Sequence, residues 1–183
     1  MPPLPTPTLQ TPRLRLRPFT PADIAAIFAL QSDPIVMRYA ERPPWTEQAQ
    51  AERFITVSQE MAQEGRGARL AIERQTDGAF LGTCNIFNWN QTNRNAKLGY
   101  SLTTTAWGQG IATEACRALL HWAFRALNLH RVQSETHPDN IASNRVLEKL
   151  GFIHEGTLRE DCIVNDEITD SKIYGLLRRD WTG

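Results

Sequence analysis

The stretch TTTAWGQGIATEACRALLHWAF, residues 103–124, places two glycines, Gly108 and Gly110, where a run of threonines gives way to a helical pattern. Glycine inside a helix costs roughly 1 kcal/mol relative to alanine, so glycines here need a compensating role. The first amides of a helix have no intrahelical partner and carry partial positive charge. We therefore expect the glycines to let the backbone approach an anion closely, with a pyrophosphate as the natural ligand.

Two other nucleotide-binding turns and one structural turn compete with this interpretation. A nucleoside triphosphate loop needs a lysine followed by Ser or Thr after its glycines, and no lysine is present here. A dinucleotide fingerprint needs a third glycine where Thr113 stands, although Glu135 lies at the end of the next predicted strand. That alternative stays open, as does a tight strand-to-helix turn that binds no ligand.

Composition excludes several classes of protein. The chain has 183 residues, 41% of them hydrophobic and 22% charged, which suits one soluble globular domain. Twenty Lys and Arg residues balance 20 Asp and Glu residues, so the formal net charge is zero. The sequence therefore lacks the basic surface expected of a nucleic-acid-binding protein or of a protein that binds anionic membranes.

The cysteines and the N-terminal segment indicate the cellular setting. Cys84, Cys116 and Cys162 are scattered and odd in number, which predicts neither a disulfide framework nor a metal site. No apolar run approaches the roughly 20 residues needed to span a bilayer. We expect a cytoplasmic protein with a flexible, proline-rich arm at 1–8 and a single domain at 9–183.

Apolar periodicity predicts an α+β fold on a mostly antiparallel sheet. Strands are expected near residues 13–19, 68–73, 79–87, 96–103, 131–136, 152–160 and 169–179, with 161–167 as a connection. Helices are expected near residues 20–34, 46–61, 109–127 and 139–151, the last ended by Gly151. The arginines of the first strand form either a phosphate-binding patch or a solvated strand face.

A second motif, NIASNRVLEKLGF at 140–152, is expected to begin a helix. Asn140, Ser143, Asn144 and Leu147 fall at i, i+3, i+4 and i+7, so they share one face. This face either lines a ligand channel or consists of a helix cap at Asn140 followed by surface residues.

Together, WGQGIATEA at 107–115 and the second motif resemble the GNAT acyltransferase superfamily, and within it the ribosomal-protein N-terminal acetyltransferases. TPRLRLRPFTPAD at 11–23, LGY at 98–100, EGTLRE at 155–160 and YGLLRRDW at 174–181 agree with this resemblance. It spans about Leu9 to Trp181. It implies a twisted sheet of about seven strands flanked by helices, with two central strands splayed apart, and an N-acetyltransferase that uses acetyl-CoA.

The resemblance also implies where the cofactor lies. Acetyl-CoA is expected between the strands at 96–103 and 131–136, with Asn140 anchoring the pantetheine and Asn144 contacting the cofactor. Other expected contacts are the pantetheine-pairing backbone of Ser101, Leu102 and Thr103, the pyrophosphate-binding turn of Trp107, Gly108, Gln109, Gly110, Ile111, Ala112 and Thr113, and Ser143.

The catalytic groups depart from the family pattern at two positions. The usual tyrosine that protonates the departing thiolate is Leu147 here, and Ser143, one turn earlier, resembles the substitute. An amide near Leu102 is expected to stabilise the oxyanion. An acidic residue often precedes the LGY stretch, but this chain has Lys97. The base is therefore open among Tyr100, Glu160, Glu41, Asp170 and His137.

The acceptor is expected to be a primary amine, with peptide N-termini favoured because an α-amine loses its proton more easily than lysine does. Tyr39, Glu41, Trp45 and Trp89 are expected to line its groove. A small-molecule amine such as a polyamine is the alternative acceptor. A non-catalytic acyl-CoA-binding module and a dinucleotide-binding oxidoreductase are the alternative classes. A homodimer is compatible with the sequence.

Overall fold

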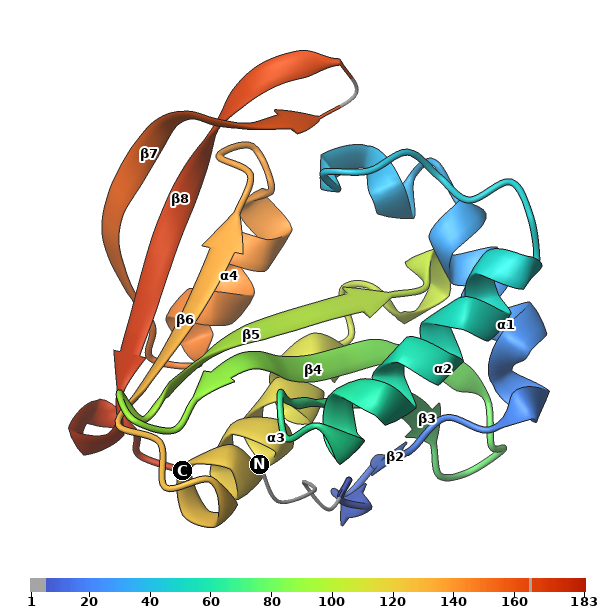
Figure 1. Cartoon of the computed structure of the whole chain (residues 1–183), viewed down its shortest axis with the longest axis horizontal. Coiled ribbons are helices and arrows are strands. Elements are labelled where there is room, and N and C mark those ends of the chain that lie inside the picture. Colours follow the sequence, from blue (N-terminus) through green and yellow to red (C-terminus); the bar gives the residue numbers. More distant parts are fainter. Residues whose placement is uncertain (1–5, 165) are drawn as a thin grey trace.

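A computed structural model describes residues 6–164 and 166–183 as one eight-stranded sheet with four α-helices (Figure 1). Residues 1–5 of the expected arm lie outside the described residues. The strands are β1 Leu9–Gln10, β2 Leu14–Arg17, β3 Ala68–Arg74, β4 Phe80–Asn90, β5 Asn95–Leu102, β6 Arg131–Thr136, β7 Ile153–Val164 and β8 Glu167–Leu177. The helices are α1 Ile24–Ser32, α2 Ala49–Gln63, α3 Ile111–Ala126 and α4 Ile141–Lys149, with short 3-10 turns at Pro21–Asp23, Val36–Tyr39, Thr104–Ala106 and Arg178–Asp180.

The sheet has the strand order β1-β2-β3-β4-β5-β6-β8-β7, and only β5 and β6 pair in parallel. Their pairing covers three steps and ends at Lys97 opposite Gln133. One residue further, the Ser134 hydroxyl donates to the Leu98 carbonyl at 3.1 Å in place of a backbone bond. From there β5 and β6 run apart, as Figure 1 shows. The expected splayed pair is confirmed.

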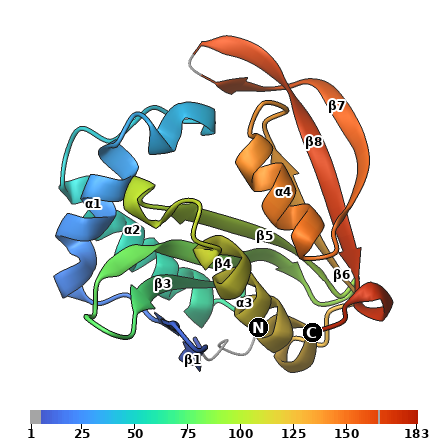
Figure 2. The ribbon, with the colours of Figure 1, turned by 180° about the vertical axis from the view of Figure 1, so that it is seen from behind.

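Helices cover both faces of the sheet. Figures 1 and 2 place α2 in front of β3 and β4 and α3 behind them. The apolar residues of α3 recur every three or four positions and form one face, which is buried in the main core. A second, smaller core lies between α1, α2 and β3, and comprises Phe19, Ile27, Ala51, Ile55 and Ala71. No helix of the described chain is long and apolar enough to cross a membrane.

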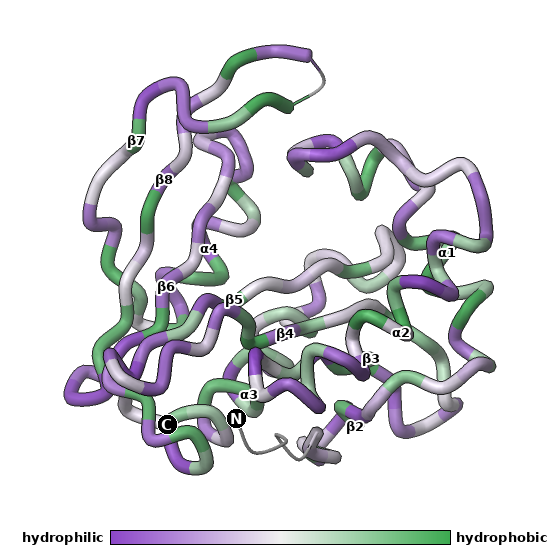
Figure 3. Tube along the Cα trace, viewed as in Figure 1, coloured by the Kyte–Doolittle hydropathy of each residue, from purple (hydrophilic) through white to green (hydrophobic). Residues whose placement is uncertain are grey.

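The C-terminal hairpin differs from the expectation. The segment 161–167, expected as a connection, belongs largely to strands, because β7 runs to Val164 and β8 begins at Glu167. The β7–β8 register shifts between Leu158 and Cys162, where Glu160 adopts a positive φ of 54°. Figure 3 shows hydrophobic and hydrophilic residues mixed along this hairpin, which extends beyond the body of the protein. Much of the hairpin is exposed, so its sequence lacks the regular alternation of apolar residues from which the length of a strand is predicted.

The sheet also has one strand more than the expected seven. Leu9 and Gln10 pair with Leu16 and Arg15 to form the edge strand β1. A two-residue strand is too short to produce a recognisable alternation of apolar and polar residues.

Candidate active site

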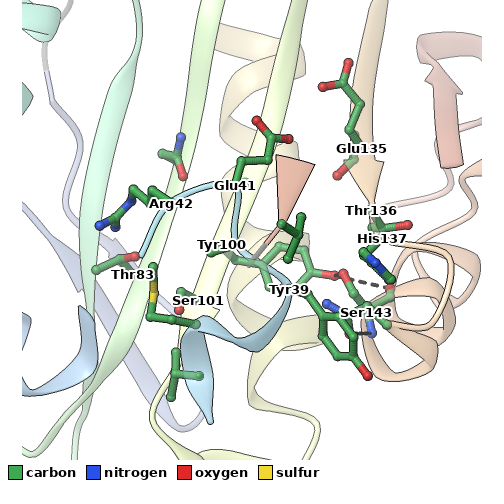
Figure 4. A pocket seen from close by; sticks show the side chains of 18 of the residues that line it. Tyr39, Glu41, Arg42, Thr83, Tyr100, Ser101, Glu135, Thr136, His137 and Ser143 are labelled. Atoms are coloured by element: carbon green, nitrogen blue, oxygen red, sulfur yellow. Dashed lines mark hydrogen bonds between the residues drawn. The ribbon is translucent and has the colours of Figure 1, made fainter. Parts of the chain in front are cut away.

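Two cavities meet where β5 and β6 diverge. The turn cavity, of about 570 Å³, lies between the glycine turn, the end of β5 and α4. The sheet cavity, of about 340 Å³, lies over β4, β5 and β6 beside the hairpin β7–β8 (Figure 4). Both volumes are in the range of ligand sites. The residues that line both cavities are Val36, Tyr39, Tyr100, Ser101, Asn140 and Ser143.

The glycine turn forms one wall of the turn cavity. Gly108 and Gly110 have φ values of 71° and 75°, the left-handed conformation that glycine adopts without strain. A Cβ at Gly108 would meet nothing within 4 Å, so the space in front of it is open. Glu114 N makes the first intrahelical bond, to the Gly110 carbonyl at 3.0 Å. The preceding amides, those of Ile111 to Thr113, are therefore available to an anion.

The left-handed backbone is a reason for the glycines that the sequence argument did not include. Arg13 holds this turn in place, since its Nη1 donates to the Gln109 carbonyl at 3.0 Å and its Nε donates to Glu114 at 2.6 Å. Burial of Glu114 opposes its ionisation, but hydrogen bonds from Thr11 and Arg13 outweigh it and lower the pKa. Arg13 is thus engaged within the protein, which argues against a phosphate-binding patch on the first strands.

The end of β5 is the strand segment expected to pair with pantetheine. Beyond Lys97, the β5 edge facing β6 has no strand partner, which leaves its backbone groups available to an extended ligand. Ser101 and Leu102 line the turn cavity, whereas Thr103 and Gln109 do not. Trp107 also lines it, and its indole N–H donates to the Leu102 carbonyl at 3.0 Å.

Tyr100 and Ser143 meet at the junction of the two cavities (Figure 4). The Tyr100 hydroxyl lies 2.7 Å from Ser143 Oγ, and either group can donate. Ser143 is held by the helix cap, because its backbone N–H donates to Asn140 Oδ1 at 3.1 Å. Burial raises the pKa of Tyr100 well above its usual value, so the phenol is protonated at neutral pH.

The rest of the α4 face points into the protein. Asn144 is buried, accepts from the Thr136 hydroxyl at 2.6 Å and donates to the Pro138 carbonyl at 3.2 Å. It lines neither cavity, so the structure gives it a positioning role in the β6–α4 turn instead of the expected cofactor contact. Leu147 is fully buried in the core.

The acidic candidates fall in different places. Glu41 lines the sheet cavity, together with His137. Glu160 and Asp170 line neither cavity; they lie on the hairpin, where the Glu160 backbone N–H donates to Asp170 at 3.0 Å. Glu160 is therefore not placed to act as the base. The register shift at this position could not be inferred from local sequence.

Glu135 is a carboxylate in the sheet cavity that the sequence analysis did not consider as a base. It accepts from Lys97 Nζ at 2.6 Å and from the Gln133 amide at 2.9 Å. The sequence feature that could have indicated Glu135 is its position near the end of a predicted central strand. Among the described residues, no group of three or more His, Cys, Asp or Glu side chains could hold a metal ion.

Of the four residues expected to line the acceptor groove, two line the sheet cavity. Tyr39 and Glu41 line the sheet cavity, and the Tyr39 ring lies 5.0 Å from the His137 ring. Trp45 instead packs edge-on against Phe54 at 5.6 Å in the second core. Trp89 packs against the main core. Cys162 is half-buried and also lines the sheet cavity.

Solved structures share this architecture and define the class. Mycobacterium smegmatis RimJ in complex with CoA-disulfide has a TM-score of 0.90 and 25% identity, covering 100% of this chain and 93% of that chain. The spermidine N-acetyltransferase from Vibrio cholerae, in complex with CoA and spermine, has a TM-score of 0.84 and 21% identity, covering 94% of this chain and 100% of that chain. The fold is that of acetyltransferases that bind CoA.

Sequence comparison gives the family. The acetyltransferase (GNAT) domain matches residues 13–153. A Bacillus licheniformis protein named "Uncharacterized N-acetyltransferase p20" is 33% identical over 176 residues, which cover 96% of this chain and 99% of that protein. "Uncharacterized N-acetyltransferase YoaA" of Bacillus subtilis (strain 168) is 36% identical over 172 residues, covering 94% and 97%. The chain belongs to the GNAT family and is an acetyl-CoA-dependent acetyltransferase. The resemblance inferred from its two motifs is confirmed.

Proposed function

We propose that the protein transfers the acetyl group of acetyl-CoA to the α-amine of a peptide or protein N-terminus, by direct attack in a ternary complex. The observation that carries this proposal is the Tyr100–Ser143 pair, at 2.7 Å, where the two cavities meet. Acetyl-CoA enters through the turn cavity and the amine through the sheet cavity. The thioester and the amine then meet beside these two hydroxyls.

We assign the two hydroxyls successive roles in one proton relay, in which Ser143 acts on the substrate and Tyr100 acts on Ser143. As the amine nitrogen bonds to the thioester carbon and the C–S bond breaks, Ser143 donates a proton to the departing thiolate. Tyr100, kept protonated by burial, returns a proton to Ser143, and the proton that the acetylated nitrogen loses as it becomes an amide restores the Tyr100 phenol. The backbone amide near Leu102 is our candidate donor to the oxyanion.

The choice of an α-amine rests on which groups line the junction. The six residues common to both cavities include no carboxylate. At pH 7, removing a proton costs about 1 kcal/mol for an α-amine with a pKa near 8 and roughly 4–5 kcal/mol for lysine. A junction without a strong base therefore suits the α-amine, with its proton passing to water in the sheet cavity.

A thermal-shift experiment tests the cofactor assignment. Acetyl-CoA or CoA at 100 times its Kd should add about 2.7 kcal/mol to the free energy of unfolding, which is roughly 5–11 °C for a chain of this size. NAD should produce no shift. The absence of a shift with both CoA species would contradict the assignment of the turn cavity.

An acceptor panel tests the substrate class by measuring CoA release. Peptides with a free N-terminus should be acetylated, and N-terminally blocked peptides that contain lysine should not be. A polyamine is the second candidate, because the carboxylates of Glu41 and Glu135 line the sheet cavity and a spermine-bound acetyltransferase shares the fold. Preferential turnover of spermidine would favour that candidate.

A further inference from the structure

Two arginines in the sheet cavity form no ion pair with any residue that the structure describes. Arg42 follows the 3-10 turn Val36–Tyr39, and Arg69 is the second residue of β3; both line the sheet cavity. No carboxylate in the part of the chain that the structure describes forms an ion pair with either guanidinium. Arg15 and Arg17 provide a contrast, since both form ion pairs with Glu73.

Neutral groups hold both guanidiniums in place. Arg69 donates to the Ser58 hydroxyl at 3.1 Å and lies 4.3 Å from the centre of the Phe54 ring. Arg42 donates to Gln31 and lies 4.8 Å from the centre of the Trp45 ring. These contacts fix the two positions without neutralising the charge.

The electrostatic setting favours an anion from outside the protein. Burial lowers the pKa of Arg42, and burial together with the charge of Arg42 lowers the pKa of Arg69 to about 10. Both groups remain cationic at neutral pH, close enough to repel each other. Arg69 is half-buried and Arg42 is exposed, so both guanidiniums can be reached from solvent, and a bound carboxylate would supply the missing charge.

The sheet register gives the distance from Arg69 to Gly99, which lies next to Tyr100 at the junction of the two cavities. Arg69 lies opposite Asn85, and Asn85 lies opposite Gly99, directly before Tyr100. Two strand spacings separate Arg69 from Gly99, or about 10 Å between their Cα atoms. Asn85 and Gly99 line the cavity between them, and the Asn85 side chain lies over Gly99, where it can hydrogen-bond to a bound peptide. An extended peptide advances about 3.4 Å per residue, so about three residues span this distance.

We propose that the acceptor carries a carboxylate as well as its amine, and that Arg42 and Arg69 bind this carboxylate while the amine lies beside Tyr100 and Ser143. This inference rests on the proposed acetylation of an amine in the sheet cavity. It predicts a peptide N-terminus with Asp or Glu within its first four residues. A polyamine, which has no anionic group, would leave the arginine pair uncompensated.

A pair of peptides tests the carboxylate requirement. Ser-Ala-Asp-Ala-amide and Ser-Ala-Asn-Ala-amide differ only in one charge, and the ratio of their kcat/KM values should be roughly tenfold to hundredfold in favour of Asp. In Arg42→Gln and Arg69→Gln this ratio should fall toward one, while Arg69→Lys, which keeps the charge, should retain part of it. Arg42→Glu should favour the corresponding Lys peptide.

Arg66→Gln is the matched control. Arg66 lies three residues before Arg69, outside both cavities, and pairs with Glu64 on the surface. Its substitution should leave the Asp/Asn ratio unchanged. Thermal melts of all variants show whether they fold. A wild-type ratio near one, or a ratio that survives in folded Arg42→Gln and Arg69→Gln, overturns the proposal.

Binding separates this inference from the proposed function. The CoA-loaded protein is titrated with the same two peptides by calorimetry, whether or not any peptide is turned over. Tighter binding of the Asp peptide, lost in Arg42→Gln, supports the carboxylate site even if peptide acetylation fails; equal affinities overturn it. Free aspartate and the dipeptide Ser-Asp, added in parallel, distinguish a small acceptor from a peptide.

Discussion

The hydroxyl oxygen of Tyr100 lies 2.7 Å from Ser143 Oγ, although 43 residues separate them in the sequence. Tyr100 belongs to β5 and Ser143 to α4, two elements that come together at the splay of the central strands. Their pairing places two hydrogen-bonded hydroxyls at the junction of both cavities. The first two predictions concern this pair.

Substituting Ser143 by alanine should lower kcat by about 10²–10³-fold, because the departing thiolate loses its proton donor. The KM for acetyl-CoA should change by no more than about twofold, since the turn and the β5 edge remain intact. Steady-state kinetics measure both constants. A kcat equal to that of the wild-type enzyme removes Ser143 from the mechanism.

Tyr100 should make the enzyme tolerant of alkaline pH. We expect kcat/KM for a peptide to rise with pH to a plateau near pH 8, where the α-amine is deprotonated. No decline should follow up to about pH 10, because burial raises the pKa of Tyr100 and keeps the donor protonated. A rate that keeps rising far above pH 8 would instead indicate that Tyr100 acts as the base.

Gly110→Ala should weaken CoA binding by about tenfold, because its left-handed backbone aims the first amides of α3 into the turn cavity. It should also lower the free energy of unfolding by about 1 kcal/mol. Gly78→Ala is a matched control, with a φ of 70°, open space around it and no contact with either cavity. Calorimetry should show normal CoA affinity for Gly78→Ala. Equal losses of affinity in both variants would argue against an anion site at the turn.

Arg17→Met should destabilise the protein by about 3 kcal/mol, because Arg17 bridges the buried carboxylates of Asp23 and Glu73. Arg74→Met removes an exposed ion pair with Asp77 and should cost less than about 0.5 kcal/mol. Urea denaturation at pH 7 measures both variants. A similar cost for the two substitutions would show that burial of the network contributes nothing extra.

The same network should make stability depend on pH. Burial opposes ionisation of Asp23, but hydrogen bonds from Arg17 and the Thr20 backbone outweigh it and lower the pKa below the unfolded value near 3.9. The resulting stability is present above about pH 4 and is lost as the pH falls through the folded-state pKa. The loss below pH 4 should be smaller in Asp23→Asn. An unchanged acid slope in that variant would assign the loss to other groups.

The limits of most elements followed from local sequence. The strand at 131–136 is found with the predicted ends, and α3 and α4 lie within two residues of expectation, since helical periodicity and Gly151 marked them. The hairpin β7–β8 was the main failure. Its strands are largely exposed and carry a register shift at Glu160, so neither its length nor the position of Glu160 outside both cavities could be predicted.

By itself, the sequence determined the glycine turn, the capped helix that carries Ser143, and the family to which the chain belongs. These features depend on backbone conformation and on spacing along one helix, which neighbouring residues specify. Only the tertiary structure decided that Asn144 faces inward, that Glu135 pairs with Lys97, and that no described carboxylate pairs with Arg42 or Arg69. Those outcomes depend on strand register and on which charges become neighbours, and both are set by contacts between residues far apart in the chain.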